Sequence, residues 1–419
     1  MKDKIKSIAF ISDHASPLAD LGGVDTGGQN VYVAQLCRFL AGQGYAIDLY
    51  TRWDNAEMQQ VVNWLPGVRV IHVKAGPVEI TPKEELLPFM REFRENMMAF
   101  MRQENRNYEL IHAHFFMSAL VAAGIKQLLG IPYTVTFHAL GAIRQIHQGS
   151  SDKFPCDRIQ IEKEVALLAD RVIAECPQDR DDLMMHYGVP ACKICIIPCG
   201  FSNQEFYPVE KHQARELLKL NADEPIVLQL GRMVPRKGVD NVVKAIAKLK
   251  ANGKKVKLVI VGGESEYPDP QSSPELSRLY SIAQAHDVLD HIHFAGRKGR
   301  DELKYYYSAA DVFVTTPWYE PFGITPLEAM ACGTPVIGAN VGGIKYSVVD
   351  GETGALVTPD DPDELADKVN ELIFDKDRLQ RLGQNAIERV NRYFTWTNVA
   401  EKVSSVYENI MDQKLMQAG

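Results

Sequence analysis

The stretch Trp318-Tyr-Glu-Pro-Phe-Gly-Ile-Thr-Pro-Leu-Glu-Ala-Met-Ala-Cys-Gly-Thr-Pro-Val-Ile337 decides the fold of this chain. It follows an apolar run at 311–315 that is typical of a buried parallel strand, and 321–323 predicts a tight turn. Residues 326–331 predict a short helix that Gly333 ends, before a further strand begins. A strand, a glycine loop and a helix start in this order place backbone N–H groups where they can bind an anion.

Two carboxylates lie on either side of this turn. Glu320 stands before the predicted helix and Glu328 lies within its first turns. With an anion held between them, they suit a ligand that has a phosphate in the middle and hydroxyl groups at both ends, such as a nucleotide sugar. Two glutamates at this spacing could also be ordinary loop and helix carboxylates, but the Pro-Phe-Gly and Cys-Gly-Thr-Pro-Val around them favour a site.

The segment from Glu320 through Pro-Phe-Gly and Glu328 to Cys-Gly-Thr-Pro-Val resembles the donor-site signature of the retaining glycosyltransferases of family 4. This resemblance implies the GT-B fold, an α/β architecture in which two Rossmann-like domains face an interdomain cleft and a C-terminal helix crosses back to the N-terminal domain. We therefore expect an acceptor-binding domain at 1–200, a nucleotide-sugar-binding domain at 201–395 and the crossover helix at 396–419.

The bulk composition fits this expectation. A chain of 419 residues suits two domains of about 200 residues each. The net charge of −8 gives no indication of a nucleic-acid partner, and no stretch is apolar enough for a membrane span. Seven cysteines, an odd number, favour reduced thiols in the cytoplasm. The C-x2-C-x3-C at 192–199 lacks a fourth ligand, so a strand is favoured over a metal site. A homo-oligomer is compatible with the sequence, which leaves the oligomeric state open.

Strands and helices are expected to alternate along the whole chain, which predicts parallel sheets with right-handed crossovers. The expected strands are 5–12, 46–50, 68–73, 110–114, 133–137, 171–174, 193–198, 225–230, 256–261, 291–295 and 311–315. The expected helices are 82–105, 239–249, 361–374, 376–394 and 396–411, and 264–275 is expected to be a loop. Ligands of such sheets bind at the carboxyl ends of the strands, where His14, His114 and His138 fall.

A glycine-rich loop follows the first expected strand. Its second glycine pair, Gly27 and Gly28, opens a helix and lets the backbone approach a donor closely. The loop lacks the G-x-G-x-x-G pattern, so NAD is not expected.

Cationic side chains must balance the diphosphate of a nucleotide sugar. Arg232 and Lys237 match the diphosphate clamp of the resembling family in order and spacing, and Lys298 lies where that family contacts the nucleotide. These cations and the helix start would stabilise the charge on the leaving phosphate without a metal or other cofactor. Asp361-Pro-Asp363 is interpreted as a helix cap and not as a metal site.

The resemblance also implies a role for each donor-site residue. A UDP-linked sugar is the favoured donor. Glu328 would bind the ribose, Glu320 the sugar hydroxyls and His138 the 6-hydroxyl end of the sugar. The catalytic residues are then His138, Glu320, Arg232 and Lys237. The donor would further contact Gly27, Gly28, Lys298, Phe322, Gly323, Ile324, Thr325 and Glu328.

The resemblance does not single out one acceptor, because two groups of the family with different acceptors are similar to this sequence. The segments around His14 and Asn30 resemble the mycothiol-pathway N-acetylglucosaminyltransferases that use inositol phosphate, in which Asn30 matches the inositol contact and Lys83 and Arg158 match phosphate contacts. Phe115 stands where that subgroup has Tyr, and Ala139 where it has Thr, so two hydroxyl donors are lost. Other segments resemble sucrose synthases and sucrose-phosphate synthases, although Pro177 replaces the basic residue that the latter use for fructose phosphate.

Three functions are therefore weighed. The first is a retaining hexosyltransferase that moves a sugar from a nucleotide diphosphate sugar to a sugar, a sugar phosphate or inositol phosphate. The second is a phosphorylase or epimerase of the same architecture, and the third is a non-catalytic protein that binds nucleotide sugars.

Overall fold

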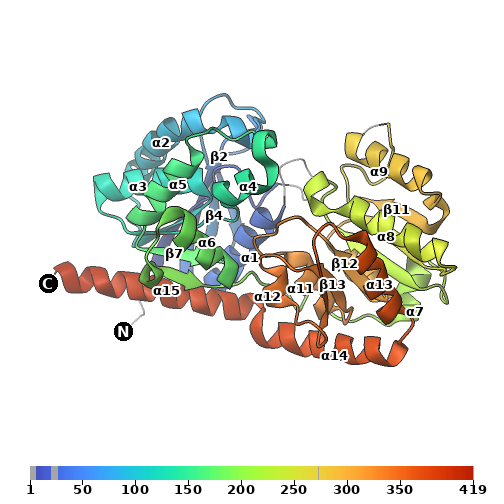
Figure 1. The fold of residues 1–419 in the computed structure, drawn as a ribbon. Coiled ribbons are helices and arrows are strands. Elements are labelled where there is room, and N and C mark those ends of the chain that lie inside the picture. The colour runs from blue at the N-terminus through green and yellow to red at the C-terminus, as the bar shows by residue number, and fades with distance from the viewer. Residues whose placement is uncertain (1–5, 20–26, 272, 419) are drawn as a thin grey trace. The chain divides into compact units, whose positions relative to one another are not determined.

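The computed structural model describes residues 6–19, 27–271 and 273–418. The chain divides into two compact units, which can be followed by colour in Figure 1. The described residues of the first unit are 6–19, 27–198 and 396–418, and those of the second unit lie within 199–395. Acceptor binding by the first unit and nucleotide-sugar binding by the second stay predictions.

The described part of the first unit contains an eight-stranded sheet in the order β3-β4-β2-β1-β5-β6-β7-β8. All neighbours pair in parallel except β3, which runs antiparallel to β4. The strands are β1 Lys6–Ile11, β2 Tyr45–Arg52, β3 Val61–Leu65, β4 Val68–Val73, β5 Leu110–His114, β6 Tyr133–Thr136, β7 Arg171–Ala174 and β8 Ile194–Ile196. The sequence analysis missed β3, a half-buried edge strand of five residues in which Asn63 interrupts the apolar residues.

Helices follow the strands of this sheet as expected for crossovers. They are α1 Gly28–Gly42, α2 Met90–Gln103, α3 Phe116–Leu129, α4 Gly141–Gln148, α5 Arg158–Leu168, α6 Pro177–Tyr187 and α15 Trp396–Ala418. The continuous helix expected at 82–105 is wrong at its start, where two 3-10 turns, Lys83–Glu85 and Leu87–Phe89, precede α2. Pro88 lacks the N–H that an α-helix interior needs, so α2 begins only after it.

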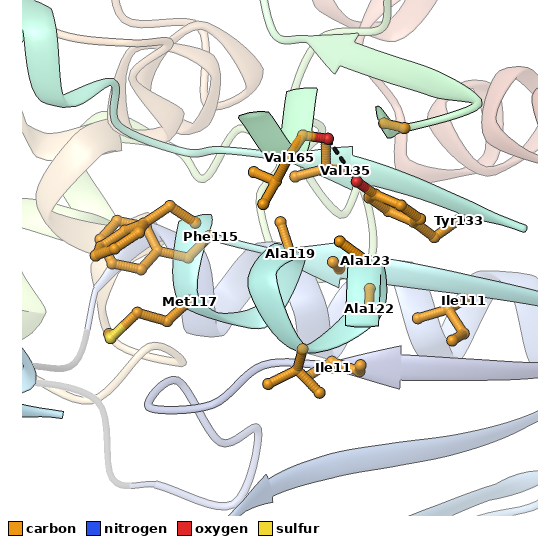
Figure 2. Packing of buried hydrophobic residues seen from close by; sticks show 14 of the residues in the cluster. Ile11, Ile111, Phe115, Met117, Ala119, Ala122, Ala123, Tyr133, Val135 and Val165 are labelled. Atoms are coloured by element: carbon orange, nitrogen blue, oxygen red, sulfur yellow. Dashed lines mark hydrogen bonds between the residues drawn. The ribbon is translucent and has the colours of Figure 1, made fainter. Parts of the chain in front are cut away.

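A large part of the core of the first unit lies between α3 and the elements that it packs against, which are β1, β5, β6 and α5. Figure 2 shows its small residues Ala119, Ala122 and Ala123 among larger buried side chains of the strands and of α5. Small side chains let the helix approach the sheet closely. The hydroxyl of Tyr133 in β6 donates a hydrogen bond to the carbonyl of Val165 in α5, which satisfies a polar group inside this core.

The last helix of the chain belongs to this core. In Figure 1 the red α15 lies with the elements of the first unit, and it packs against α1. Trp396 is fully buried with its ring centroid 5.4 Å from that of Tyr32. Further along α15, the hydroxyl of Tyr407 lies 2.6 Å from Nδ1 of His112 in β5. The C-terminal helix therefore completes a unit that the chain has left almost 200 residues earlier.

The second unit contains a parallel sheet in the order β11-β10-β9-β12-β13-β14. Its strands are β9 Ile226–Leu230, β10 Lys257–Val261, β11 Ile292–Gly296, β12 Val312–Thr315, β13 Val336–Ala339 and β14 Gly354–Val357. Its helices are α7 Lys211–Leu217, α8 Val239–Ala251, α9 Pro274–Ala285, α10 Leu303–Ala309, α11 Ile324–Ala331, α12 Ile344–Ser347, α13 Pro362–Ile373 and α14 Lys376–Tyr393. The sequence analysis missed the short edge strand β14, and the loop expected at 264–275 gives way to α9 at Pro274.

Each sheet has a point where the order of its strands reverses. In the first unit this point lies between β1 and β5, and in the second it lies between β9 and β12. Open parallel sheets bind their ligands outside the carboxyl ends of the strands at such a point. The residues that follow β1, β5, β9 and β12 are therefore the first place to look for function.

Candidate active site

The loops after β9 and β12 bring cations and a carboxylate together in the second unit. Lys237, in the loop after β9, donates a hydrogen bond to the carboxylate of Glu320, in the loop after β12. The guanidinium of Arg236 lies 4.0 Å from the same carboxylate and 5.3 Å from the ring centre of Tyr319. The structure thus places the predicted residues Lys237 and Glu320 in contact, and it adds Arg236, which the sequence analysis missed although it precedes Lys237 directly.

These charges influence one another strongly. Burial lowers the pKa of Lys237, and the nearby Glu320 opposes this shift. Burial would raise the pKa of Glu320, but Lys237, Arg236 and Arg232 outweigh it and hold that pKa below its ordinary value. Glu320 therefore stays ionised at neutral pH. Three cationic side chains around one carboxylate leave this cluster with an excess of positive charge, which suits an anionic ligand.

The close approach of the two loops requires a glycine. Gly238 has φ +65°, and a Cβ placed on it would lie 2.0 Å from the carbonyl oxygen of Thr316. The Thr316 hydroxyl donates a 3.0 Å hydrogen bond back to the Gly238 carbonyl. Only glycine fits both the backbone angle and this contact, so the loop of Lys237 is fixed against the end of β12.

The start of α11, two residues before the predicted helix at 326–331, lies beside this cluster. Gly323 is the N-cap of α11 with φ +89°, and a Cβ placed on it would lie 3.3 Å from Cγ of Glu320. Ile324 and Thr325 form the first turn of α11, where backbone N–H groups have no partner within a helix. The ring of Phe322 is buried, with its centroid 6.1 Å from that of Phe394, and this packing anchors the turn.

Glu328 is buried, which the sequence did not indicate. One of its carboxylate oxygens lies 2.9 Å from the guanidinium of Arg300, and the other accepts a 3.0 Å hydrogen bond from the hydroxyl of Tyr307. Arg300 also donates a 2.5 Å hydrogen bond to Glu205. Burial lowers the pKa of Arg300, but the two carboxylates outweigh this and raise it. A ribose hydroxyl at Glu328 would thus bind a carboxylate that already has two protein partners. Lys298, two residues before Arg300, is half-buried.

In the first unit, the residues after β1 contact those after β5. Nδ1 of His14 lies 2.9 Å from the carboxylate of the buried Asp13, which accepts a hydrogen bond from Ser118. The His14 ring packs edge-on against Phe115, with centroids 4.9 Å apart. Phe115 has φ +83° at the N-cap of α3, a conformation that costs energy for a bulky residue and is often found at functional sites.

A line of polar side chains crosses the ends of β5, β6 and β7. Nδ1 of His114 lies 3.1 Å from Nε2 of His138, and Nδ1 of His138 lies 3.2 Å from the carboxylate of Glu175. Burial, with smaller effects from His112 and His138, lowers the pKa of His114 well below its ordinary value, so His114 is neutral. Both ring nitrogens of His138 have protein partners, and a ligand that bonds to this ring has to displace one of them. Glu175 was missed, although its place directly after β7 could have revealed it.

The expected acceptor residues make separate sets of contacts. Asn30 accepts a 3.0 Å hydrogen bond from the N–H of Gly27 and donates one of 2.9 Å to the Ser16 carbonyl, so it shapes the start of α1 at Gly28. Lys83 is half-buried, 3.9 Å from Glu84. Arg158 is brought to Phe115, with its guanidinium carbon 4.9 Å from the ring centre. The earlier glycines of this loop, at 22 and 23, lie outside the described residues.

Comparison with known proteins decides the family. A family model described as "Glycosyltransferase Family 4" matches residues 26–205, and one described as "Glycosyl transferases group 1" matches 210–389. The D-inositol 3-phosphate glycosyltransferase 2 of Catenulispora acidiphila is 33% identical over 418 residues, which cover 98% of this chain and 97% of that protein. The chain belongs to the family 4 glycosyltransferases.

Solved structures agree with this family and with the GT-B fold of two Rossmann-like domains. The sucrose-phosphate synthase of Thermosynechococcus elongatus is 36% identical to this glycosyltransferase, with a TM-score of 0.89 over 97% of this chain and 100% of that one. The Anabaena protein HepE, solved in complex with UDP and glucose, shares the fold with a TM-score of 0.73 and 21% identity over 96% of this chain and 99% of that one. The expected fold class and the expected enzyme class are both confirmed.

Two further expectations concern membranes and metals. Among the helices that the structure describes, none is long and apolar enough to span a membrane. Over the same residues, no three His, Cys, Asp or Glu side chains are grouped so that they could hold a metal ion. The Asp361 carboxylate accepts hydrogen bonds from the N–H groups of Asp363 and Glu364, which confirms that Asp361-Pro-Asp363 is a helix cap of this glycosyltransferase.

A pH dependence of stability is expected from a neighbour of Glu175. Burial, together with Glu175, raises the pKa of Asp179 from 3.8 to about 8. The folded protein keeps this proton where the unfolded chain releases it, so the free energy of unfolding should fall as pH rises from about 4 to 8, by up to about 1.4 kcal/mol per pH unit. In urea titrations, Asp179→Asn should flatten this part of the profile, whereas the exposed control Asp181→Asn should keep it. A profile that is unchanged by Asp179→Asn would contradict the assignment.

Proposed function

We propose that this glycosyltransferase moves a sugar from a UDP-sugar to a hydroxyl group of a small polar acceptor, with retention of the anomeric configuration. The observation that carries the proposal is the cluster of Arg236, Lys237 and Glu320 at the strand-order reversal of the second sheet, beside the N-terminus of α11. A diphosphate needs concentrated positive charge and N–H donors, and both occur here next to a carboxylate that can accept bonds from sugar hydroxyls.

In this proposal the second unit performs the chemical work on the leaving group. Negative charge develops on the β-phosphate oxygen as the sugar departs, and Lys237, Arg232 and the first-turn amides of α11 stabilise it. Glu320 orients the sugar and Glu328 the ribose. Because these cations supply the neutralising charge, we propose that no metal is required, and activity should persist in excess EDTA.

The acceptor is proposed as a class. Relatives of this chain are named inositol phosphate glycosyltransferases, and the similar solved structure is named a sucrose-phosphate synthase, so polyols and sugars with or without phosphate are the candidates. A sucrose-phosphate-synthase-like reaction is the second candidate function, and it is favoured by the higher identity of that structure. We also propose a cytoplasmic location, which the seven cysteine thiols support.

The first test is binding. Saturating UDP should raise the melting temperature, because a ligand at about 100 times its Kd stabilises the folded protein by roughly 2.7 kcal/mol. ADP and GDP at the same concentration serve as comparisons for the base. A matrix of UDP-, ADP- and GDP-sugars against fructose, fructose 6-phosphate, inositol and inositol phosphate, read by mass spectrometry, should then reveal a product. NMR of the new anomeric proton tests retention.

Other outcomes would support other functions. Epimerised nucleotide sugar in the absence of an acceptor would indicate an epimerase, and phosphate-dependent cleavage of a glycoside would indicate a phosphorylase. Binding without any product would support a non-catalytic protein. A melting temperature that no nucleotide shifts would overturn the proposed donor site itself.

A further inference from the structure

The start of α4 is held by side chains from two other helices. The N–H of Gly141 donates to both carboxylate oxygens of Glu162 in α5, at 3.1 and 2.9 Å. The N–H of Ala142 donates a 2.9 Å hydrogen bond to the hydroxyl of Tyr187 in α6, and this hydroxyl donates to Glu162 at 2.5 Å. Two of the first-turn amides of α4, to which an anion could otherwise bind, therefore already have partners within the protein.

Arg158 completes this arrangement on the other side of the loop. Its Nε donates a 2.7 Å hydrogen bond to Glu162, and its Nη2 donates one of 2.6 Å to the carbonyl of Ala139. Ala139 directly follows His138, which has φ +60°. A backbone in this conformation persists only when its surroundings hold it. Here the backbone groups that are held, at Ala139, Gly141 and Ala142, lie within four residues of His138.

The guanidinium of Arg158 is sealed from ligands. Arg158 is 2% exposed, Glu162 is fully buried and Tyr187 is 1% exposed. The rings of three phenylalanines surround the guanidinium carbon at 4.4 to 5.0 Å, namely Phe115, Phe116 and Phe154. Its third nitrogen, Nη1, is buried and has no hydrogen-bond partner. The charge of Arg158 is already balanced by Glu162, so an acceptor phosphate would have to part these rings to reach it.

We propose that Arg158, Glu162 and Tyr187, here called the α4 frame, are positioning residues that fix the backbone of the 138–142 loop and thereby the place of His138. On this reading Arg158 acts through the loop and does not bind the phosphate of an acceptor. The inference rests on the proposed function and on the role at the donor sugar that the family resemblance implies for His138. It assigns the discrimination between phosphorylated and unphosphorylated acceptors to other residues.

The kinetic test compares two frame variants with two acceptors. Tyr187→Phe removes one hydroxyl that holds Ala142, and Arg158→Lys keeps the charge but loses the forked contact with Glu162 and Ala139. Both should lower kcat at least roughly tenfold, because each variant loses a hydrogen bond to the charged Glu162 as well as one to the loop backbone. The loss should be equal for fructose 6-phosphate and fructose, or for the inositol pair if the enzyme uses it, with KM for the acceptor little changed.

A matched control is available in the same unit. The hydroxyl of Tyr108 is also buried and makes two hydrogen bonds, to Asp48 and to Tyr50, both of 2.6 Å. Tyr108 precedes β5, at the end opposite to His114. Tyr108→Phe therefore removes the same group at similar depth, and it should leave kcat within about twofold if only the frame positions the loop.

Hydrogen exchange supplies a readout that needs no activity. Amides of the peptide 139–148 should exchange roughly tenfold faster in Tyr187→Phe than in the wild type, with no such change in Tyr108→Phe. Unchanged exchange at 139–148 would overturn the inference. The inference would also be overturned if Arg158→Lys lost activity only with the phosphorylated acceptor while Tyr187→Phe kept full activity. If the wild type transfers no sugar, but exchange at 139–148 still increases in Tyr187→Phe and not in Tyr108→Phe, the proposed function is refuted and the role of the α4 frame stands.

Discussion

Replacing Lys237 with methionine is expected to lower kcat/KM for sugar transfer by roughly 10²- to 10³-fold, the size of effect seen when one group that stabilises developing charge is removed. Lys237 is the cation in direct contact with Glu320, and Gly238 and Thr316 fix its loop. Without the ammonium, Glu320 loses the cation that is hydrogen-bonded to it, and the guanidinium of Arg236 remains 4.0 Å away. The variant then loses a positive charge and leaves a largely buried carboxylate poorly paired, so it should bind the diphosphate less tightly.

The measurement is initial rate against donor concentration, with the UDP-induced shift in melting temperature as a binding readout. Lys244→Met is the matched control, because Lys244 lies in the same unit, is one-third exposed and pairs with Asp240 of its own helix. It should change neither quantity by more than about twofold, since exposed ion pairs contribute little. Turnover and a UDP shift that survive in Lys237→Met would contradict the proposed donor site.

Replacing Arg300 with methionine is expected to destabilise the protein by roughly 3 to 5 kcal/mol, because it leaves a buried charge without its partner. Glu328 is 2% exposed and would keep only the hydroxyl of Tyr307. Glu205 would lose its 2.5 Å contact as well. The loss should be visible in urea titrations, with the melting temperature falling in parallel.

Two further variants make this result interpretable. Arg300→Met combined with Glu328→Gln should recover part of the loss, because a neutral amide costs less to bury than an unpaired carboxylate. Arg278→Met removes an arginine that pairs with Glu275 and Asp240 but is 38% exposed, so it should cost no more than about 1 kcal/mol. Equal losses for Arg300→Met and Arg278→Met would show that the buried network contributes little.

The elements that the sequence predicted best are those whose signals are local. The apolar run of β12, the turn at Pro321 and the start of α11 by Ile324 depend on neighbouring residues, and they were located within about two residues. The edge strands β3 and β14 were missed because pairing with one neighbour, and not their own pattern, makes them strands. The helix expected from 82 was displaced by a proline in its interior.

The candidate site shows the same division. Lys237 and Glu320 are 83 residues apart, and only the family resemblance suggested that they belong to one site. Arg158 and Glu162 form an i,i+4 pair, which in a sequence looks like an ordinary surface ion pair on an amphipathic helix. Their burial depends on aromatic rings from α3 and the 149–157 segment, which no local pattern reveals. The partner of Glu328 was hidden for a related reason, because Arg300 comes from a separate loop.

The place of α15 has a consequence for biosynthesis. When residue 198 leaves the ribosome, the first sheet is complete, but the side chains of Tyr32 and His112 still await Trp396 and Tyr407. About 200 further residues, the entire second unit, must be translated before those partners emerge. While residues 199–395 are being translated, the N-terminal half therefore remains an unfinished core with an apolar surface uncovered, and α15 can cover that surface only afterwards.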